Sequence, residues 1–202
     1  MAQRSQVYIR IKSGNCKTLI AREFSWNFSG IMLSRTRTAI QNLIRLHIEK
    51  NFKNLKSDID FFRNSIIEML DIDFYSRKKV QSVDLMKDFE LNGGICKNIN
   101  QTIFYETDTT NGKLFIDVVY NEKDSSLSIK YALTDNEIGA VMNAEKYLKW
   151  DNSDNKNWTK GMTEEELNII KADIEYLNNF SDILTKTDID NIINDDYYKY
   201  IN

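Results

Sequence analysis

Apolar residues recur with two different periods along this chain of 202 residues, and that change of period most constrains its fold. Val7, Ile9 and Ile11 occupy every second position, which is typical of a β-strand. Residues 29–52 and 163–177 instead carry apolar side chains at the three-to-four-residue spacing of an amphipathic helix. Both periods occur in a chain of ordinary single-domain length, so we expect one α+β domain.

An antiparallel sheet of about five strands is expected. The first two strands form an N-terminal hairpin around the turn at 13–15, and three more, over 101–107, 113–120 and 126–133, form a meander. Asn111-Gly112 has the composition of a two-residue hairpin turn between the first two strands of the meander. We expect helices mainly on one face of this sheet. The N-terminal hairpin either joins the meander or stands apart with the first helix.

Helix starts are indicated by capping boxes, in which Ser or Thr precedes Glu by three residues. Thr134 and Glu137 predict a helix that runs to about Trp150, and Thr163 and Glu166 predict the next one. A last helix is expected to begin near residue 188. The single domain, 1–202, then has three parts: a basic hairpin plus helix (1–56), a helix and β-meander (57–150), and an acidic helical part (151–202).

The sign of charge is unevenly distributed along the chain. Residues 1–56 carry eleven Lys and Arg against two acids, whereas residues 57–202 carry sixteen bases against twenty-eight acids. The formal net charge of −3 hides this difference. Such asymmetry concerns partners and association, and does not determine the fold. We therefore look for function first in two charged regions of the surface.

Export and membrane insertion are not expected from the sequence. The longest apolar runs are a few residues, too short to span a bilayer, and the basic start lacks the apolar stretch of a leader. Cys16 and Cys96 lie eighty residues apart and are expected to be reduced thiols of the core. These features predict a protein of the cytoplasm, that of a bacterial host cell.

Sequence motifs of catalysis are not found. The chain holds no Gly-x-Ser-x-Gly elbow and no glycine-rich phosphate loop. His47, the one histidine, lies on the apolar stripe of the first helix and is expected at the edge of the core. We therefore expect no enzyme activity and no cofactor.

Paired acids are the chemical groups that Mg²⁺ would need, but helix capping and solvation explain them here. The pairs are Asp58/Asp60, Asp71/Asp73, Asp188/Asp190 and Asp195/Asp196. Residues 151–162 place oxygen-bearing side chains at alternate positions, as an EF-hand does. Lys156 and Met162 stand where an EF-hand loop needs Gly and Glu, so we expect no metal site. Whether this loop binds a cation is left open at this point.

The basic N-terminal part could follow a phosphate backbone, with an aromatic side chain to stack on bases. The candidate residues for nucleic-acid binding are Arg35, Arg37, Arg45, Lys50, Lys53 and Trp26. The alternative is that these bases pair with the acids of the chain itself.

The acidic C-terminal part could dock on a basic surface, since spaced carboxylates resemble a phosphate track. The candidate residues for partner binding are Asp182, Asp188, Asp190, Asp195 and Asp196, with the aromatic side chains of Trp158, Tyr197 and Tyr198, which are expected to be exposed. The alternative is an ordinary solvated face of a helix.

The opening decapeptide, Met1 to Arg10, and the segment Trp26-Asn-Phe-Ser-Gly-Ile-Met32 resemble small proteins of phages and integrated elements of low-GC Gram-positive bacteria. The resemblance covers about the first sixth of the chain and implies no functional residue. It implies a context, because compact phage accessory proteins without catalytic motifs are often inhibitors of host defence, anti-CRISPR proteins among them.

Our leading hypothesis is a non-enzymatic phage or mobile-element protein that inhibits a host nucleic-acid-handling defence complex, in the manner of an anti-CRISPR protein, by surface occlusion. Its partner would be a host defence protein or nucleoprotein complex, reached without a membrane. The alternative is a DNA- or RNA-binding accessory protein that uses the basic N-terminal face. An enzyme with dispersed carboxylates is the third reading. The partner's identity and the oligomeric state stay open.

Overall fold

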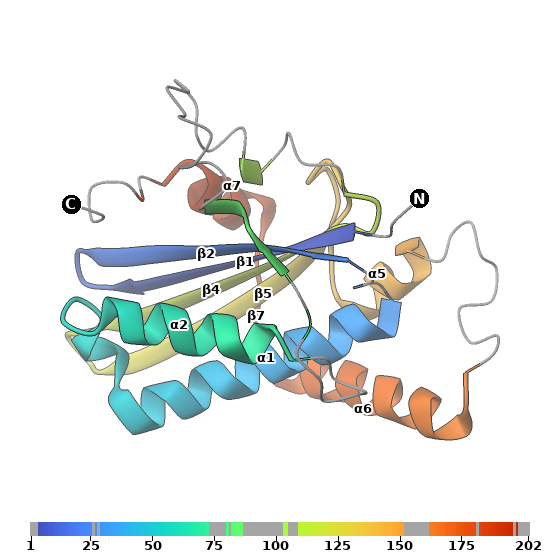
Figure 1. Ribbon diagram of the computed structural model, residues 1–202, viewed down its shortest axis with the longest axis horizontal. Helices are drawn as coiled ribbons and strands as arrows, with labels where there is room; N and C mark the ends of the chain where they lie inside the picture. Colours follow the sequence, from blue (N-terminus) through green and yellow to red (C-terminus); the bar gives the residue numbers. More distant parts are fainter. Residues whose placement is uncertain are drawn as a thin grey trace.

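The computed structural model describes residues 4–25, 27, 29–72, 80, 82–86, 103–104, 109–151, 162–180, 182–195 and 197. Within them, a seven-stranded sheet runs through the molecule (Figure 1). The strands are β1 (Arg4–Ser13), β2 (Cys16–Ser25), β3 (Ser82–Asp84), β4 (Lys113–Asn121), β5 (Ser126–Thr134), β6 (Val141–Met142) and β7 (Asp182–Ile183). Their order is β3-β2-β1-β4-β5-β6, and β7 also pairs with β5. The mostly antiparallel sheet and the helices make this an α+β fold.

The N-terminal hairpin joins the rest of the sheet through a parallel pair, β1 with β4. The hairpin itself is confirmed, with Ile9 of β1 opposite Ile20 of β2, and Gly14 takes a positive φ of 54° in its turn. On the other side of β1, Ile9 lies opposite Ile116 of β4, and the two strands run parallel. Of the two alternatives for the hairpin, the one in which it joins the other strands is therefore confirmed. The sheet is nevertheless more than the predicted antiparallel hairpin plus three-stranded meander, because it has seven strands and includes this parallel pair.

Two strands of the predicted meander are confirmed as β4 and β5, which pair antiparallel. The expected first strand is not: Ile103 and Phe104 are helical, and the rest of 101–107 lies outside the described residues. The Asn111-Gly112 pair makes no tight hairpin. Instead the backbone N–H of Asn111 donates to the carbonyl oxygen of Arg4, which guides the chain into its parallel place beside β1. The composition of Asn-Gly predicts only a local turn. It could not show that β4, which follows, pairs with β1, a strand distant in the sequence.

Helices cover both faces of the sheet unequally. They are α1 (Ser29–Lys50), α2 (Ile59–Leu70), α5 (Ala144–Asp151), α6 (Glu164–Phe180) and α7 (Lys186–Ile193), with a short 3₁₀ helix, η1 (Phe52–Asn54). In Figure 1, α1, α2 and α6 lie below the sheet and α7 lies above it. The main core lies between the sheet and the lower helices, and includes Ile9, Leu43 and Leu177. A smaller core around Tyr8, Phe115 and Ile189 lies on the other face.

The two predicted capping boxes had different outcomes. At α6 the box is confirmed, because the Glu166 N–H donates to Thr163 Oγ1 at 3.2 Å and the Thr163 N–H donates to Glu166 Oε2 at 2.8 Å. At Thr134 it is wrong, because Thr134 ends β5 and the helix begins only at Ala144. The Asp135 carboxylate instead accepts from the N–H groups of Gly139 and Ala140 and closes a turn.

Candidate functional site

A buried ionic network ties the basic N-terminal part to the acidic C-terminal part. Arg10 of β1 makes two hydrogen bonds of 2.8 Å with Asp117 of β4, one to each carboxylate oxygen. Its other terminal nitrogen lies 3.1 Å from Asp195, which also pairs with Lys17 of β2. The network holds the end of α7 on the sheet. Asp195, predicted as a docking residue, is therefore partly buried and engaged within the chain.

Burial opposes the positive charge of Arg10, but the hydrogen bonds and attraction of Asp117 outweigh it, so the pKa of Arg10 is raised. Burial also raises the pKa of the neighbouring Tyr197 well above its usual value. The Tyr197 side chain is 3% exposed, and its hydroxyl donates to the Ile192 carbonyl oxygen at 2.6 Å. The expectation that Tyr197 is an exposed docking ring is wrong, because its ring belongs to the smaller core.

Arg22 of β2 links the basic N-terminal part to the middle part of the chain, 57–150. Its guanidinium lies 3.2 Å from the Asp71 carboxylate and 3.3 Å from that of Asp84. The same group donates from Nε to the Ser82 hydroxyl at 2.8 Å. Asp71, one of the acids considered for Mg²⁺, is thus committed to holding β3 and the end of α2 against β2.

Arg35 is buried, which contradicts its predicted place in a nucleic-acid interface. Its side chain donates to the backbone carbonyl oxygen of Leu70 and, from Nε, to Asn27 Oδ1 at 3.0 Å. The guanidinium carbon lies 4.1 Å from the centre of the Phe24 ring, within cation–π range. With 7% of its surface exposed, Arg35 joins α1, α2 and β2 and offers no charge to a phosphate backbone.

Arg37 anchors α6 to α1. Its guanidinium lies 3.0 Å from the Asp173 carboxylate, which is fully buried and also accepts from the Ser34 hydroxyl. Burial raises the pKa of Asp173, although the bonds from Ser34 and Arg37 work against this rise. The guanidinium also lies over the Tyr176 ring, 4.9 Å from its centre. The predicted nucleic-acid residue Arg37 is thus engaged in helix packing.

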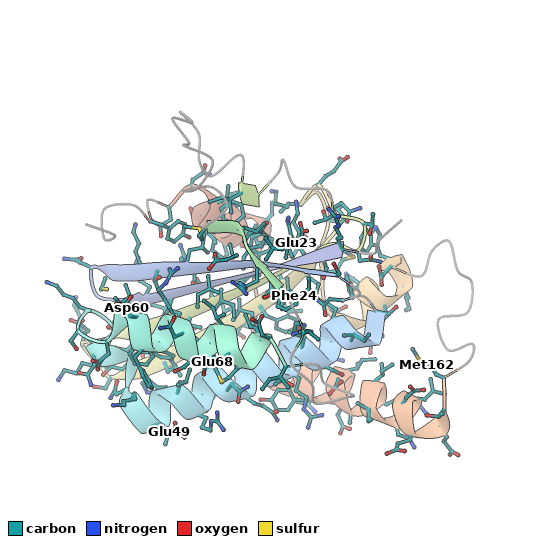
Figure 2. The ribbon with its side chains drawn as sticks, in the orientation of Figure 1. Glu23, Phe24, Glu49, Asp60, Glu68 and Met162 are labelled. Atoms are coloured by element: carbon teal, nitrogen blue, oxygen red, sulfur yellow. The ribbon has the colours of Figure 1, made fainter. Side chains whose placement is uncertain are left out.

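The remaining predicted nucleic-acid residues, Arg45, Lys50 and Lys53, are exposed around the end of α1. Acids alternate with them there. Arg45 Nε lies 3.8 Å from Glu49, and Figure 2 shows Glu49 and Asp60 at this same end of the molecule. The Lys50 ammonium lies 5.1 Å from the centre of the Phe61 ring. This end of the molecule therefore carries charges of both signs. Elsewhere among the described residues, four bases of residues 1–56 are paired with acids of residues 57–202; they are Arg10, Lys17, Arg22 and Arg37.

Exposed acids instead gather along α6. Glu164 and Glu165 begin the helix, Glu175 follows on its solvent side, and Asp182 comes just after its end; all four are exposed. The same helix buries Ile170 and Leu177 in the main core. We call these four residues the α6 acidic face. The sequence prediction included Asp182 but missed the three glutamates, although the Glu-Glu-Glu run at 164–166 was a visible signal for the first two.

Other predicted docking acids cap or brace α7. The Thr185 N–H donates to Asp188 Oδ2 at 2.8 Å in a capping box, and hydrogen bonds from Thr185 lower the pKa of Asp188. Asp190 pairs with Lys186 at 2.8 Å on the surface. The structure does not bring these acids into one cluster with Asp195. Trp26, Trp158, Asp196 and Tyr198 lie outside the described residues.

His47 and Asp151 have structural partners. His47 Nδ1 accepts from the Phe52 N–H at 3.3 Å, where α1 ends, and burial lowers the pKa of the imidazole. Asp151, the first residue of the EF-hand-like loop, accepts from the Ser29 N–H at 2.7 Å and from the Asn111 amide at 2.9 Å. Burial raises the pKa of this carboxyl. Residues 152–161 of that loop lie outside the described residues.

Within the described ranges, His, Cys, Asp and Glu side chains form no group of three that could hold a metal ion. None of the helices in that same part of the chain has the length and apolar character needed to cross a membrane.

Comparison with known proteins adds no identity: no family model, curated protein or solved structure matches this chain.

Proposed function

We propose that this protein is a non-enzymatic accessory protein of a phage or mobile element that binds a host nucleic-acid-handling defence complex and blocks it. It would act in the cytoplasm of the bacterial host, like an anti-CRISPR protein. The α6 acidic face carries the proposal. Four exposed carboxylates lie on this helix and just after its end, against one exposed lysine of the helix, Lys171. The resulting net negative charge suits a basic surface, as that of a nucleic-acid backbone does.

The rigidity of α6 supports this role. Asp173 is locked to Ser34 and Arg37 of α1, and the capping box of Thr163 and Glu166 orders the first turn. A helix that is fixed before binding loses less conformational entropy when it docks. The exposed acids would therefore meet a partner in a set geometry and shield the surface on which nucleic acid would lie.

An interference assay tests the proposal. Expression of this chain in a low-GC Gram-positive host with an active CRISPR system should raise transformation by a targeted plasmid at least tenfold. The variant Glu164→Lys/Glu165→Lys/Glu175→Lys should abolish that rise while retaining its circular dichroism spectrum. The matched control Lys50→Glu/Lys53→Glu/Lys56→Glu reverses the same number of exposed charges at the other end of the molecule and should remain active.

DNA or RNA binding by the basic N-terminal face remains the alternative, and its exposed candidates are Arg45, Lys50 and Lys53. In that case the lysine reversal would abolish binding to a DNA duplex, with a strong dependence on salt, and the glutamate reversal would not. Loss of activity in the lysine variant alone would replace the first proposal with this one. If wild-type protein leaves interference unchanged, inhibition of this defence is rejected.

A further inference from the structure

The chain changes direction immediately after α1, and His47 takes part in holding this change. α1 ends at Lys50, and Phe52 already begins η1. Asn51, between the two, has a φ of 57° and a ψ of 119°. A residue with a side chain adopts a positive φ at a cost, so the surrounding contacts must hold Asn51 in place. We call residues 51–55 the α1–η1 joint.

Hydrogen bonds and apolar contacts fix this joint. The Asn51 N–H donates to the His47 carbonyl oxygen at 2.8 Å, and Asn51 Oδ1 accepts from the Lys53 N–H at 2.9 Å. The Leu55 N–H donates to the Phe52 carbonyl oxygen at 3.0 Å. Phe52 and Leu55 are fully buried in the main core. The joint therefore anchors the end of α1 beneath the sheet.

The imidazole of His47 accepts a hydrogen bond from the backbone of this joint. The Phe52 N–H donates to His47 Nδ1 at 3.3 Å. Because Phe52 is buried, its N–H would be costly to leave without an acceptor. An imidazole nitrogen accepts only while it carries no proton. The closed joint therefore requires a neutral His47 with its proton on Nε2.

The surroundings of His47 favour this neutral form. Its ring centre lies 5.6 Å from that of Phe52 and 5.5 Å from that of Tyr120 of β4. Tyr120 is the titratable group that contacts it from the sheet. Burial lowers the pKa of the imidazole below its usual 6.5. The ionisable side chains nearest to it along α1 and the joint are all exposed, and they are Glu49, Lys50 and Lys53.

The end of α1 has the opposite electrostatic effect. His47 lies in the last turn, where the partial negative charge of a helix end favours a cation. A protonated Nδ1 would nevertheless bring its own N–H against the N–H of Phe52. The two donors cannot bond to each other, so protonation costs the hydrogen bond that closes the joint.

We propose that His47 is an acid-sensitive latch, which holds the α1–η1 joint closed while Nδ1 is unprotonated and releases it when Nδ1 is protonated. His47 is half-buried, so protons from solvent reach it. Its lost bond leaves a buried N–H unpaired beside the strained Asn51, and local opening of the joint relieves both. The joint contains no residue of the α6 acidic face, so the latch is independent of the proposed function.

The latch determines the direction of the pH effect. The folded chain holds His47 in its neutral form, so its pKa is lower in the folded chain than in the unfolded one. As the pH falls below about 6.5, the unfolded chain takes up this proton first. The stability that His47 contributes is therefore present above this pH and is lost below it.

Hydrogen exchange in the ¹⁵N-labelled full-length protein tests the latch. The protection of each amide is corrected for its intrinsic exchange rate at each pH. Between pH 7.5 and pH 5.0, protection of the Phe52 and Leu55 amides should fall at least tenfold, because the joint opens locally. The Ile9 amide of the central strand β1 should retain its protection and serves as the control for global unfolding.

Two variants separate the hydrogen bond from the proton. In His47→Asn, the amide oxygen replaces Nδ1 as an acceptor and does not titrate, so protection of Phe52 should change less than about threefold over the same pH range. His47→Leu removes the acceptor, and the Phe52 amide should exchange rapidly at both pH values. If the leucine variant does not fold, wild type and His47→Asn still decide the question.

Four results would overturn the proposal. They are equal protection of Phe52 at the two pH values in wild type, an equal fall in His47→Asn, loss of protection at Ile9 together with Phe52, and imidazole ¹⁵N shifts that place the proton of neutral His47 on Nδ1. The third would indicate global acid unfolding in place of a local latch. Failure of the interference assay would leave all four results unaffected.

Discussion

The arginines of β1, β2 and the first half of α1 differ from the glutamates of α6 in where the fold places them. Arg10, Arg22 and Arg35 are each less than 10% exposed, whereas Glu164 and Glu165 are exposed. In the sequence each set belongs to a segment in which one sign of charge is in excess. In the structure, one set holds the layers together and the other faces solvent. A charge asymmetry along a chain is therefore a poor guide to charge asymmetry on its surface.

The difference follows from the position of each element. β1 is a central strand covered on both faces, so both sets of its alternating side chains are enclosed, and Arg10 needs a buried carboxylate. α6 lies outside α1 and buries only one stripe (Figure 1). Residues on the rest of that helix remain in water, where charge costs little.

Removal of a buried cation should have the largest effect. Arg10→Met leaves Asp117 and Asp195 without their guanidinium, and should lower the free energy of unfolding by about 3–5 kcal/mol in urea denaturation. The matched control Lys186→Met breaks the exposed pair with Asp190 and should cost about 0.5 kcal/mol. Similar losses in the two variants would show that the buried network is not a main tie between the two parts.

Lys113 extends the comparison to a buried cation bonded to a neutral group. Its ammonium donates to the Phe104 carbonyl oxygen at 2.6 Å, and burial lowers its pKa from 10.5 to about 8. Between those values the unfolded chain binds more protons than the folded one, so this group's contribution to stability rises with pH. Relative to Lys113→Met, wild type should gain roughly 3 kcal/mol from pH 7 to pH 10.5. If the difference in free energy of unfolding between wild type and Lys113→Met did not change with pH, Lys113 would be solvent-exposed and the expectation would be wrong.

A buried and an exposed arginine of α1, Arg35 and Arg45, allow the effect of burial on stability to be compared within one helix. Arg35→Ala removes bonds to Leu70 and Asn27 and the contact with Phe24, and should lower the free energy of unfolding by about 2–3 kcal/mol. Arg45→Ala, whose side chain is 61% exposed, should change it by less than about 0.5 kcal/mol. Thermal unfolding of both variants under one set of conditions measures the contrast, and equal values would contradict it.

The smallest effect on stability is expected on the α6 acidic face. Glu165→Lys should change the free energy of unfolding by less than about 0.5 kcal/mol, because the side chain is exposed. Its effect should appear in association with a partner, as a slower on-rate at low salt. A loss of several kcal/mol in urea denaturation would mean that this glutamate belongs to the fold and not to a docking surface.

Local patterns in the sequence determined much of the secondary structure. Alternation identified β1, and the apolar stripe with its capping box identified α6, because both signals depend on neighbours within a few residues. The β4 and β5 strands were found in the same way. These patterns were enough to establish the α+β class, and they also placed His47 at the edge of the core.

Only the tertiary structure decided which strands meet and which charges are enclosed. The parallel pairing of β1 with β4 joins residues about one hundred positions apart, and no local motif encodes it. The same pairing brings Asp117 beside Arg10, and the two side chains form a buried ion pair between the strands. Burial depends on how the layers stack in space. For this reason a charged residue of β1 lies in the interior, whereas the charged residues of α6 lie at the surface.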